Sequence, residues 1–306
     1  MQAATYSAYA TDNSRLTVGD RPDPKVGPGQ VLIEVRAAGV NPVDWKVMAG
    51  GLDGMMDAVF PVIPGWDVAG VVRGAGPDTP EFSVGDEVMA YARKDVVQGG
   101  TFAQLVSVSA RDVARKPTAL DWPQAGGLPL VGLTALRTLD ALDVGPSDSL
   151  LIHAAAGGVG SMAVQIARFR GARVIGTASE RNHDYLRSLG AEPVTYGESL
   201  VERVRALVPD GVTTVLDCHG GQLTTTLAVL ADGGRHVSIA DPDAAQRGGR
   251  WIWVRPDGAQ LAELADLADQ GALTVEVART FALRDVGAAF DLSRTGRVRG
   301  KLVIVP

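Results

Sequence analysis

Residues 149–178, SLLIHAAAGGVGSMAVQIARFRGARVIGTA, decide the fold of this chain. The apolar run 150–152 predicts a short strand that is buried on both faces. Apolar side chains then recur at helical spacing from Val159 to Ala167, which predicts a helix. Gly171 ends that helix, as a glycine at this position commonly does, and a second strand begins at Val174. The stretch therefore reads as strand, glycine turn, helix, strand.

The glycine turn between the first strand and the helix predicts a ligand site. Its glycines let the backbone turn sharply and approach a ligand closely, and the helix directs its free amides and positive dipole end toward the same place. The pattern has alanine at its first position, Ala155-x-Gly157-x-x-Gly160, and a purely structural turn is the alternative. The flanking strands favour dinucleotide binding. The predicted pyrophosphate contacts are Ala156, Gly157, Gly158, Val159 and Gly160.

The end of the second strand indicates which dinucleotide binds. NAD sites carry an acidic residue there for the ribose hydroxyls, but this strand ends Gly176-Thr177-Ala178. Ser179 and Arg181 follow, a hydroxyl and a guanidinium suited to a 2′-phosphate. We therefore predict NADP(H). The alternative is that Glu180 binds the ribose and Arg181 is a solvated charge, which would favour NAD.

The bulk properties are those of a globular protein. A length of 306 residues predicts two domains, and a net charge of −6 gives no basic footprint for nucleic acid. The single cysteine, Cys218, excludes an intrachain disulfide and fits a reducing compartment. The first residues have no signal-peptide pattern, and no apolar run is long enough to span a bilayer. We expect a cytoplasmic protein.

Two kinds of pattern divide the chain. Strand-like and helical segments alternate through 123–270, which predicts an α/β fold with a doubly wound parallel sheet. Residues 1–122 instead carry dense proline and glycine with short strand-like runs at 31–35, 68–72 and 87–90. That pattern predicts an irregular, largely antiparallel β-barrel. Residues 271–306 read as strand, helix and strand.

Six local motifs, in order, carry a family resemblance. They are AGVNPVD (38–44), PGWDVAG (64–70), VGDEV (84–88), GTFA (100–103), HAAAGGVG (153–160) and GKLV (300–303). Together they resemble the medium-chain dehydrogenase/reductase superfamily, in particular its zinc-independent quinone oxidoreductase (zeta-crystallin-like) branch. The resemblance implies a GroES-like catalytic domain from 1–122 and 271–306, with a Rossmann NADP(H)-binding domain at 123–270.

Departures from the zinc-dependent members of that superfamily predict a site without metal. Asn41, Trp66 and Asp67 stand where those enzymes have the Cys, His and Glu of the catalytic zinc. One cysteine also leaves no four-cysteine structural zinc lobe. Without a Lewis acid, hydride addition to an electron-poor double bond is favoured over alcohol oxidation. The resemblance therefore implies an NADPH-dependent reductase of quinones or α,β-unsaturated carbonyl compounds, including polyketide-type intermediates.

The resemblance also implies catalytic candidates in the first domain. Asn41 would lie beside the nicotinamide ribose, and Lys46 replaces a tyrosine of some quinone reductases and would meet the developing oxyanion. Asp44 would hold the loop or pair with Lys46, and Tyr91 is a second candidate proton source. The structural alternatives are a turn at Asn41-Pro42, a surface pair of Asp44 and Lys46, and a packing role for Tyr91.

Further cofactor contacts follow from the resemblance and from the shared rim at the strands' carboxyl ends. Thr134 would lie near the nicotinamide half, and Tyr196 near the 2′-phosphate. Ser238, Ile239 and Ala240 would approach the nicotinamide. Arg299 and Lys301 would approach the cofactor's phosphate, with a solvated tail as the alternative.

The run Arg250-Trp-Ile-Trp-Val-Arg255 predicts a last strand with an exposed edge, and exposed edges invite pairing. Relatives dimerise through such edges, so a homodimer with Trp251 and Trp253 near its interface is expected. The alternative is that a helix at 257–270 covers the edge. A second function remains open, a protein that binds NADPH without turnover, as a crystallin or sensor.

Overall fold

The computed structural model describes all residues 1–306, and the chain forms two compact units. Unit 1 comprises Met1–Leu130 and Arg255–Pro306, and unit 2 comprises Val131–Val254. These divisions differ from the predicted 122/123 and 270/271. The reason lies in two helices that sequence reasoning assigned to the second domain. In unit 1, α2 (Trp122–Gly127) packs on β3 (Gln30–Val40) and β4 (Asp67–Ala75). α8 (Gly258–Asp269) packs on β7 (Val113–Arg115) and η1 (Ala110–Asp112) of the same unit.

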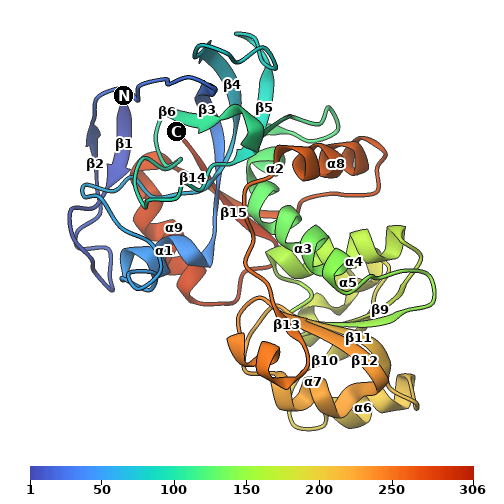
Figure 1. Cartoon of the computed structure of the whole chain (residues 1–306). Helices are drawn as coiled ribbons and strands as arrows, with labels where there is room; N and C mark the ends of the chain where they lie inside the picture. Colours follow the sequence, from blue (N-terminus) through green and yellow to red (C-terminus); the bar gives the residue numbers. More distant parts are fainter. The chain divides into compact units, whose positions relative to one another are not determined.

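Unit 2 is built on a six-stranded parallel sheet in the order β10-β9-β8-β11-β12-β13 (Figure 1). This is the strand order of Rossmann dinucleotide-binding folds and confirms the predicted α/β class. The strands are β8 (Ser149–His153), β9 (Arg173–Ala178), β10 (Glu192–Thr195), β11 (Val212–Asp217), β12 (Leu230–Ser238) and β13 (Arg250–Trp251).

Helices cover both faces of this sheet, as the alternation predicts. α4 (Gly158–Phe169) and α5 (His183–Ser188) lie on one face, and α6 (Leu200–Leu207) and α7 (Leu223–Val229) on the other (Figure 1). The core under α6 and α7 is aliphatic and fully buried, with Leu151, Ile175, Val204 and Val215 at its centre. α3 (Pro129–Ala141) begins at the end of unit 1, and η2 (Glu180–Asn182) and η3 (Pro242–Arg247) are short 3-10 turns.

The predicted last strand at 250–255 is shorter than expected. β13 covers only Arg250 and Trp251, and it pairs in parallel with β12 through Val237 and Ser238. Trp251 and Trp253 remain more than a third exposed, with ring centroids 6.2 Å apart in an edge-to-face arrangement. The sheet edge thus carries one exposed indole ring, and a second follows shortly after the strand.

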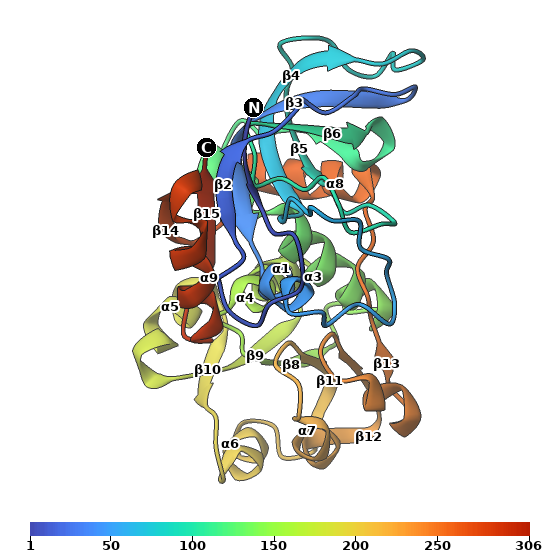
Figure 2. The same ribbon diagram turned by 90° about the vertical axis from the view of Figure 1, so that its left-hand side faces the viewer.

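Unit 1 is largely antiparallel. Its main sheet has the order β14-β15-β3-β4-β5-β7, and β6 also pairs with β3 (Figure 2). Only β14 and β15 run in parallel. The strands are β3 (Gln30–Val40), β4 (Asp67–Ala75), β5 (Glu87–Tyr91), β6 (Leu105–Ser109), β7 (Val113–Arg115), β14 (Val277–Ala282) and β15 (Lys301–Val305), with a separate hairpin of β1 (Gln2–Thr5) and β2 (Thr17–Asp20).

Two further helices of unit 1 matter for the site. α1 (Pro42–Met48) follows β3 directly, because Pro42 favours the first helical turn. α9 (Val286–Arg294) follows η4 (Leu283–Asp285) and packs on β15. Because β15 pairs with β3, the last residues of the chain lie beside the start of α1.

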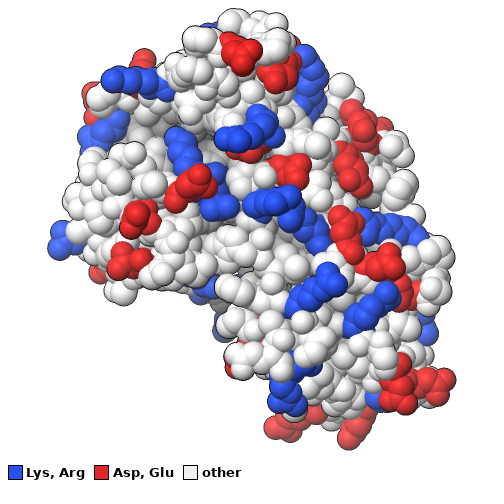
Figure 3. Space-filling model, in the orientation of Figure 1, with Lys and Arg blue, Asp and Glu red and all other residues white.

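The surface carries charges of both signs. Acidic and basic side chains are interspersed over the face drawn in Figure 3. No helix combines the length and the apolar composition needed to cross a membrane.

Candidate active site

The glycine turn of unit 2 brings the start of α4 close to the end of β8. Gly157 caps α4 without offering a side chain. Thr177 of β9 fixes the turn. Its Oγ1 accepts from the backbone amide of Ala154 (3.1 Å), and its carbonyl accepts from the backbone amide of Ala155 (3.0 Å). A Cβ on Gly160 would lie 2.5 Å from the Ala154 carbonyl oxygen. Only glycine therefore allows this close approach.

This arrangement fits a dinucleotide pyrophosphate. α4 has twelve residues, and its first turn is not capped by a side chain. The amides of an uncapped first turn, together with the helix dipole, favour an anion. The five predicted contacts, residues 156–160, all lie in this turn and in the first residues of α4. The strand–turn–helix arrangement is confirmed, and the contacts themselves remain predictions.

The carboxyl ends of β9 and β10 carry the residues predicted for the 2′-phosphate. Ser179 follows β9, Arg181 lies exposed on η2, and Tyr196 follows β10 with 60% of its surface exposed. Arg203 of α6 donates twice to the carbonyl of Thr195 (3.0 and 2.8 Å). Sequence reasoning missed Arg203, which holds the backbone directly before Tyr196.

Four further predicted cofactor contacts lie at the end of β12 and in α3. Ser238 is 2% exposed, and its hydroxyl donates to Asp217 Oδ2 (3.0 Å) and accepts from the amide of Ala240 (3.2 Å). The Ser238 side chain therefore shapes the turn. The backbone amides of Ile239 and Ala240 already donate, to the Asp217 carbonyl (3.1 Å) and to Ser238 Oγ, and the approach of these residues to the nicotinamide remains a prediction. Thr134 is buried in α3.

In unit 1, Asn41 and Asp44 form the start of α1. The backbone amide of Asn41 donates to Asp44 Oδ2 (2.8 Å), three residues ahead. Both residues are buried, with 1% and 3% exposed. Asp44 thus holds the loop, which was one of its two predicted roles. Lys46 is exposed, with its Nζ 5.6 Å from the Trp45 ring centroid, so the expected pair between Asp44 and Lys46 is not formed.

Lys301 of β15 joins this group from the far end of the sequence. Its buried Nζ donates to the Val40 carbonyl (3.0 Å) and to Asn41 Oδ1 (2.5 Å), and lies 3.5 Å from Asp67 Oδ2. Asn41 Nδ2 donates to the same Asp67 oxygen (2.8 Å). The Lys301 side chain is 3% exposed and its ammonium already faces three oxygen acceptors, which argues against the predicted contact with the cofactor's phosphate.

The cluster of Asn41, Asp44, Asp67 and Lys301 sets one ammonium against two buried carboxyl groups. Burial raises the pKa of Asp44 to about 8, and the charge of Asp67 adds to that rise. Burial also raises the pKa of Asp67, against the opposing effect of the Lys301 ammonium. Burial lowers the pKa of Lys301, and the two carboxylates counteract this. At neutral pH, the arrangement favours a protonated Asp44 beside a Lys301–Asp67 ion pair.

Two other predicted residues are placed less favourably. Tyr91 is 1% exposed and meets Trp66 edge-to-face at 6.2 Å between ring centroids. Burial raises the pKa of its phenol, which makes Tyr91 a poor proton donor. Arg299 pairs with Glu276 of the same unit (2.6 Å).

Sequence reasoning also missed the partnership of Lys301 with Asp67. The available signal was one charged residue in each of two otherwise apolar runs, 67–72 and 301–305. A charged residue in such a run is rarely buried without a partner.

No group of three or more His, Cys, Asp or Glu side chains in the chain is arranged to hold a metal ion. Of the three positions discussed for zinc, Trp66 offers no ligand atom, and the Lys301 ammonium lies against the other two, Asn41 and Asp67.

Comparisons with known proteins agree with this fold. Residues 27–118 match the model of the alcohol dehydrogenase GroES-like domain, and residues 189–304 that of a zinc-binding dehydrogenase family. The chain is 31% identical to an NADPH-dependent alkenal/one oxidoreductase of Arabidopsis thaliana, over all of this chain and 80% of the relative.

Solved structures are similar over the whole chain. The quinone oxidoreductase from Coxiella burnetii has a TM-score of 0.89 and 32% identity, with 100% of this chain and 99% of that one covered. A mycobacterial protein solved in complex with NADPH has a TM-score of 0.87 and 28% identity, with both chains fully covered.

Proposed function

This chain belongs to the medium-chain dehydrogenase/reductase superfamily, in its quinone oxidoreductase branch, and we propose that it transfers hydride from NADPH to a quinone or an α,β-unsaturated carbonyl compound. The observation that carries the proposal is the strand–turn–helix of β8 and α4, with no acidic residue at the end of β9. The names of the similar proteins support the substrate class.

The chain's own residues fit a nicotinamide dinucleotide. The uncapped start of α4 and the turn fixed by Thr177 would hold the pyrophosphate, and the bound cofactor would supply the hydride. Ser179, Arg181 and Tyr196 would hold a 2′-phosphate, which favours NADP(H). The relative named for NADPH and the structure with NADPH support this preference.

We further propose that the reaction proceeds without zinc. The side chains at the three relevant positions are an amide, an indole and a carboxylate that already faces an ammonium. This donor set does not suit a catalytic zinc, which takes three ligands, usually from His, Cys and Glu. Chemistry without a Lewis acid favours substrates whose double bond is already electron-poor.

The residues of unit 1 divide into positioning and donating roles. Asn41 and Asp44 are committed to the buried cluster with Lys301 and Asp67, so they position the start of α1. Lys46 is the exposed candidate for the oxyanion that develops when hydride reaches the β-carbon of an enone. A proton then reaches the α-carbon or the oxygen.

The test follows the oxidation of NADPH or NADH by the purified protein, with and without a chelator. The acceptors are p-benzoquinone, phenanthrenequinone, an alkyl enone, an enoyl thioester and a saturated ketone. We expect oxidation of NADPH, insensitive to chelator, with quinone or enone acceptors. Activity on the ketone alone, lost on chelation, would overturn the zinc-free proposal. NADPH binding without turnover of any acceptor would favour a protein that only binds NADPH.

The preference for NADPH has its own test. Replacing Arg181 by alanine should raise the KM for NADPH at least tenfold, because a charge-assisted contact to the 2′-phosphate is lost. The KM for NADH should change little. Equal effects on the two cofactors would contradict the assignment and favour the alternative in which Glu180 binds the ribose.

We also propose a homodimer through the β13 edge, where Trp251 and Trp253 are exposed side by side. A cytoplasmic location remains the expectation from the sequence.

A further inference from the structure

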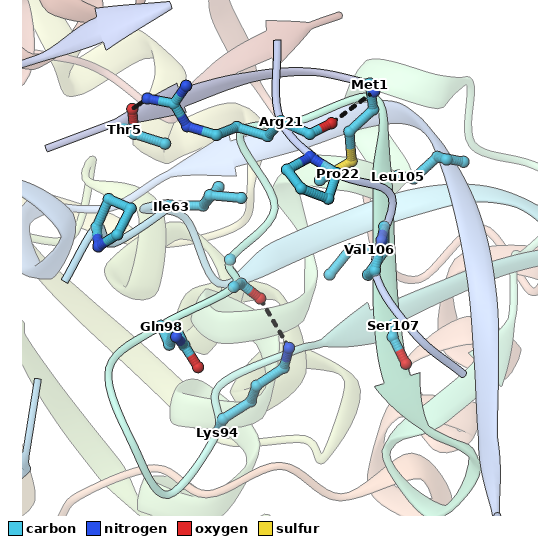
Figure 4. A pocket seen from close by; sticks show the side chains of 14 residues that line it. Met1, Thr5, Arg21, Pro22, Ile63, Lys94, Gln98, Leu105, Val106 and Ser107 are labelled. Atoms are coloured by element: carbon cyan, nitrogen blue, oxygen red, sulfur yellow. Dashed lines mark hydrogen bonds between the residues drawn. The ribbon is translucent and has the colours of Figure 1, made fainter. Parts of the chain in front are cut away.

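Unit 1 contains a cavity of about 210 Å³ that none of the site residues above lines. It lies between the β1–β2 hairpin, strand β6 and the loop that follows β5 (Figure 4). At about 30 Å³ per water molecule, its volume corresponds to roughly seven waters. A ligand with a single ring or a short acyl chain would fit this space.

The walls of the cavity are mainly apolar. Pro22 and Pro61 line it, together with Ile63 and with Leu105 and Val106 of β6. Three neutral polar side chains, Thr5, Gln98 and Ser107, also line it. Apolar walls with a few polar groups are typical of sites for small organic molecules.

The charged side chains that line this cavity are of one sign. Lys94 and Arg21 line it, and no Asp or Glu side chain does, although the whole chain carries a net charge of −6. Figure 4 shows the Lys94 side chain extending from its loop toward the space below Ile63 and Pro22. The Lys94 Nζ donates to the carbonyl of Gly99 (2.8 Å) and forms no ion pair.

Arg21 is only partly satisfied by its neighbours. Its Nη1 donates to the Asp20 carbonyl (2.8 Å) and its Nη2 to Thr5 Oγ1 (2.7 Å). Its Nε is buried and has no hydrogen-bond partner within the protein. Arg21 and Lys94 are both partly buried, and a partly buried charge without an opposite charge loses hydration that nothing replaces. Burial accordingly lowers the pKa of Lys94, and a bound anion would offset that effect.

We propose that this cavity binds a small organic anion, a carboxylate with an apolar ring or short acyl chain, through Lys94, with Arg21 adding positive charge to the same wall lining. The carboxylate would accept from the Lys94 ammonium, and the apolar body would pack against Ile63 and Val106. This site goes beyond the proposed reductase function and does not depend on it.

The test measures benzoate binding by isothermal titration calorimetry to the full chain, in the absence of NADPH and of any reductase substrate. Benzamide, which has the same ring and no charge, is the matched ligand control. We expect benzoate to bind with millimolar affinity or better, and benzamide at least tenfold more weakly. This comparison needs no variant, so misfolding cannot obscure it.

Two variants locate the site. Lys94→Gln should weaken benzoate binding at least tenfold. Lys25→Gln, which removes an exposed charge next to the lining residue Pro24, should leave it within twofold. The proposal is overturned if benzoate does not bind at millimolar concentrations, if benzamide binds equally well, or if the two variants weaken binding to the same extent. Because reduction is not measured, failure of the reductase proposal would leave this result unaffected.

Discussion

Replacing Lys301 by methionine tests whether the buried cluster holds unit 1 together. Asp67 is fully buried and Asp44 is 3% exposed, so neither can recover its hydration when the ammonium is lost. Removing one partner of a buried ion pair costs about 3–5 kcal/mol. A typical domain has only about 5–15 kcal/mol of stability. We therefore expect Lys301→Met to lose a large part of the free energy of unfolding at neutral pH.

The pH dependence of that loss has a defined sign. Without the ammonium, the pKa of Asp67 in the folded state rises further above its value in the unfolded chain. The folded protein then binds more protons than the unfolded one, so its stability falls as the pH increases between those two pKa values. The variant should be least impaired in mildly acidic buffer and most impaired in mildly alkaline buffer.

Urea unfolding followed by circular dichroism, in mildly acidic and mildly alkaline buffers, measures this effect. Lys301→Arg is the control that keeps the charge, and Asp67→Asn combined with Lys301→Met removes both charges. The double variant should recover at least about 1 kcal/mol relative to the sum of the single effects. If Lys301→Met unfolds at the wild-type urea concentration in both buffers, or if the two changes are simply additive, the reasoning is refuted.

Three further predictions concern other parts of the chain. Gly160→Val should weaken NADPH binding more than tenfold in a fluorescence titration, because the valine side chain would displace the start of α4. Gly145→Ala is the control, since its Cβ has nothing within 4 Å. Equal NADPH affinities of the two variants would contradict the proposed role of the glycine turn. The raised pKa of Asp44 makes the folded state bind one more proton than the unfolded state, so the free energy of unfolding of the wild type should fall as the pH rises toward about 8. Asp44→Asn should reduce this dependence on pH. An unchanged slope of the free energy of unfolding against pH, measured by urea unfolding, would contradict this prediction. Trp251→Glu combined with Trp253→Glu should convert a dimer to a monomer in light scattering after gel filtration, and a dimer of unchanged mass would place the interface elsewhere.

Local patterns were sufficient to predict unit 2. A parallel sheet alternates strands and helices along the chain, so residues 149–240 carry the whole arrangement in sequence order. The prediction weakened at 250–255, where β-prone residues suggested a full strand. Only Arg250 and Trp251 form the strand, and one further hydrogen bond joins the Ile252 amide to the Ser238 carbonyl (3.0 Å) before the chain leaves the sheet.

Non-local partnerships were not predictable in the same way. Lys301 meets Asn41 and Asp67 only because β15 pairs with β3 and β3 with β4, so no spacing in the sequence relates the three residues. The same holds for Arg21 and Lys94, which reach one cavity from separate loops. The glycine turn was predictable because every residue that shapes it lies within about thirty positions.

The pairing of β15 with β3 has a consequence for biosynthesis. Val303 lies opposite Gly39, with all of unit 2 between them in the chain. A ribosome therefore completes residues 131–254 before it supplies the strand that covers this edge of β3. We expect unit 2 to fold first on the nascent chain. Until β15 is synthesised, this edge of β3 keeps unpaired backbone groups, which favour aggregation. Chains truncated before residue 301 should consequently depend on chaperones, even when their dinucleotide-binding unit is intact.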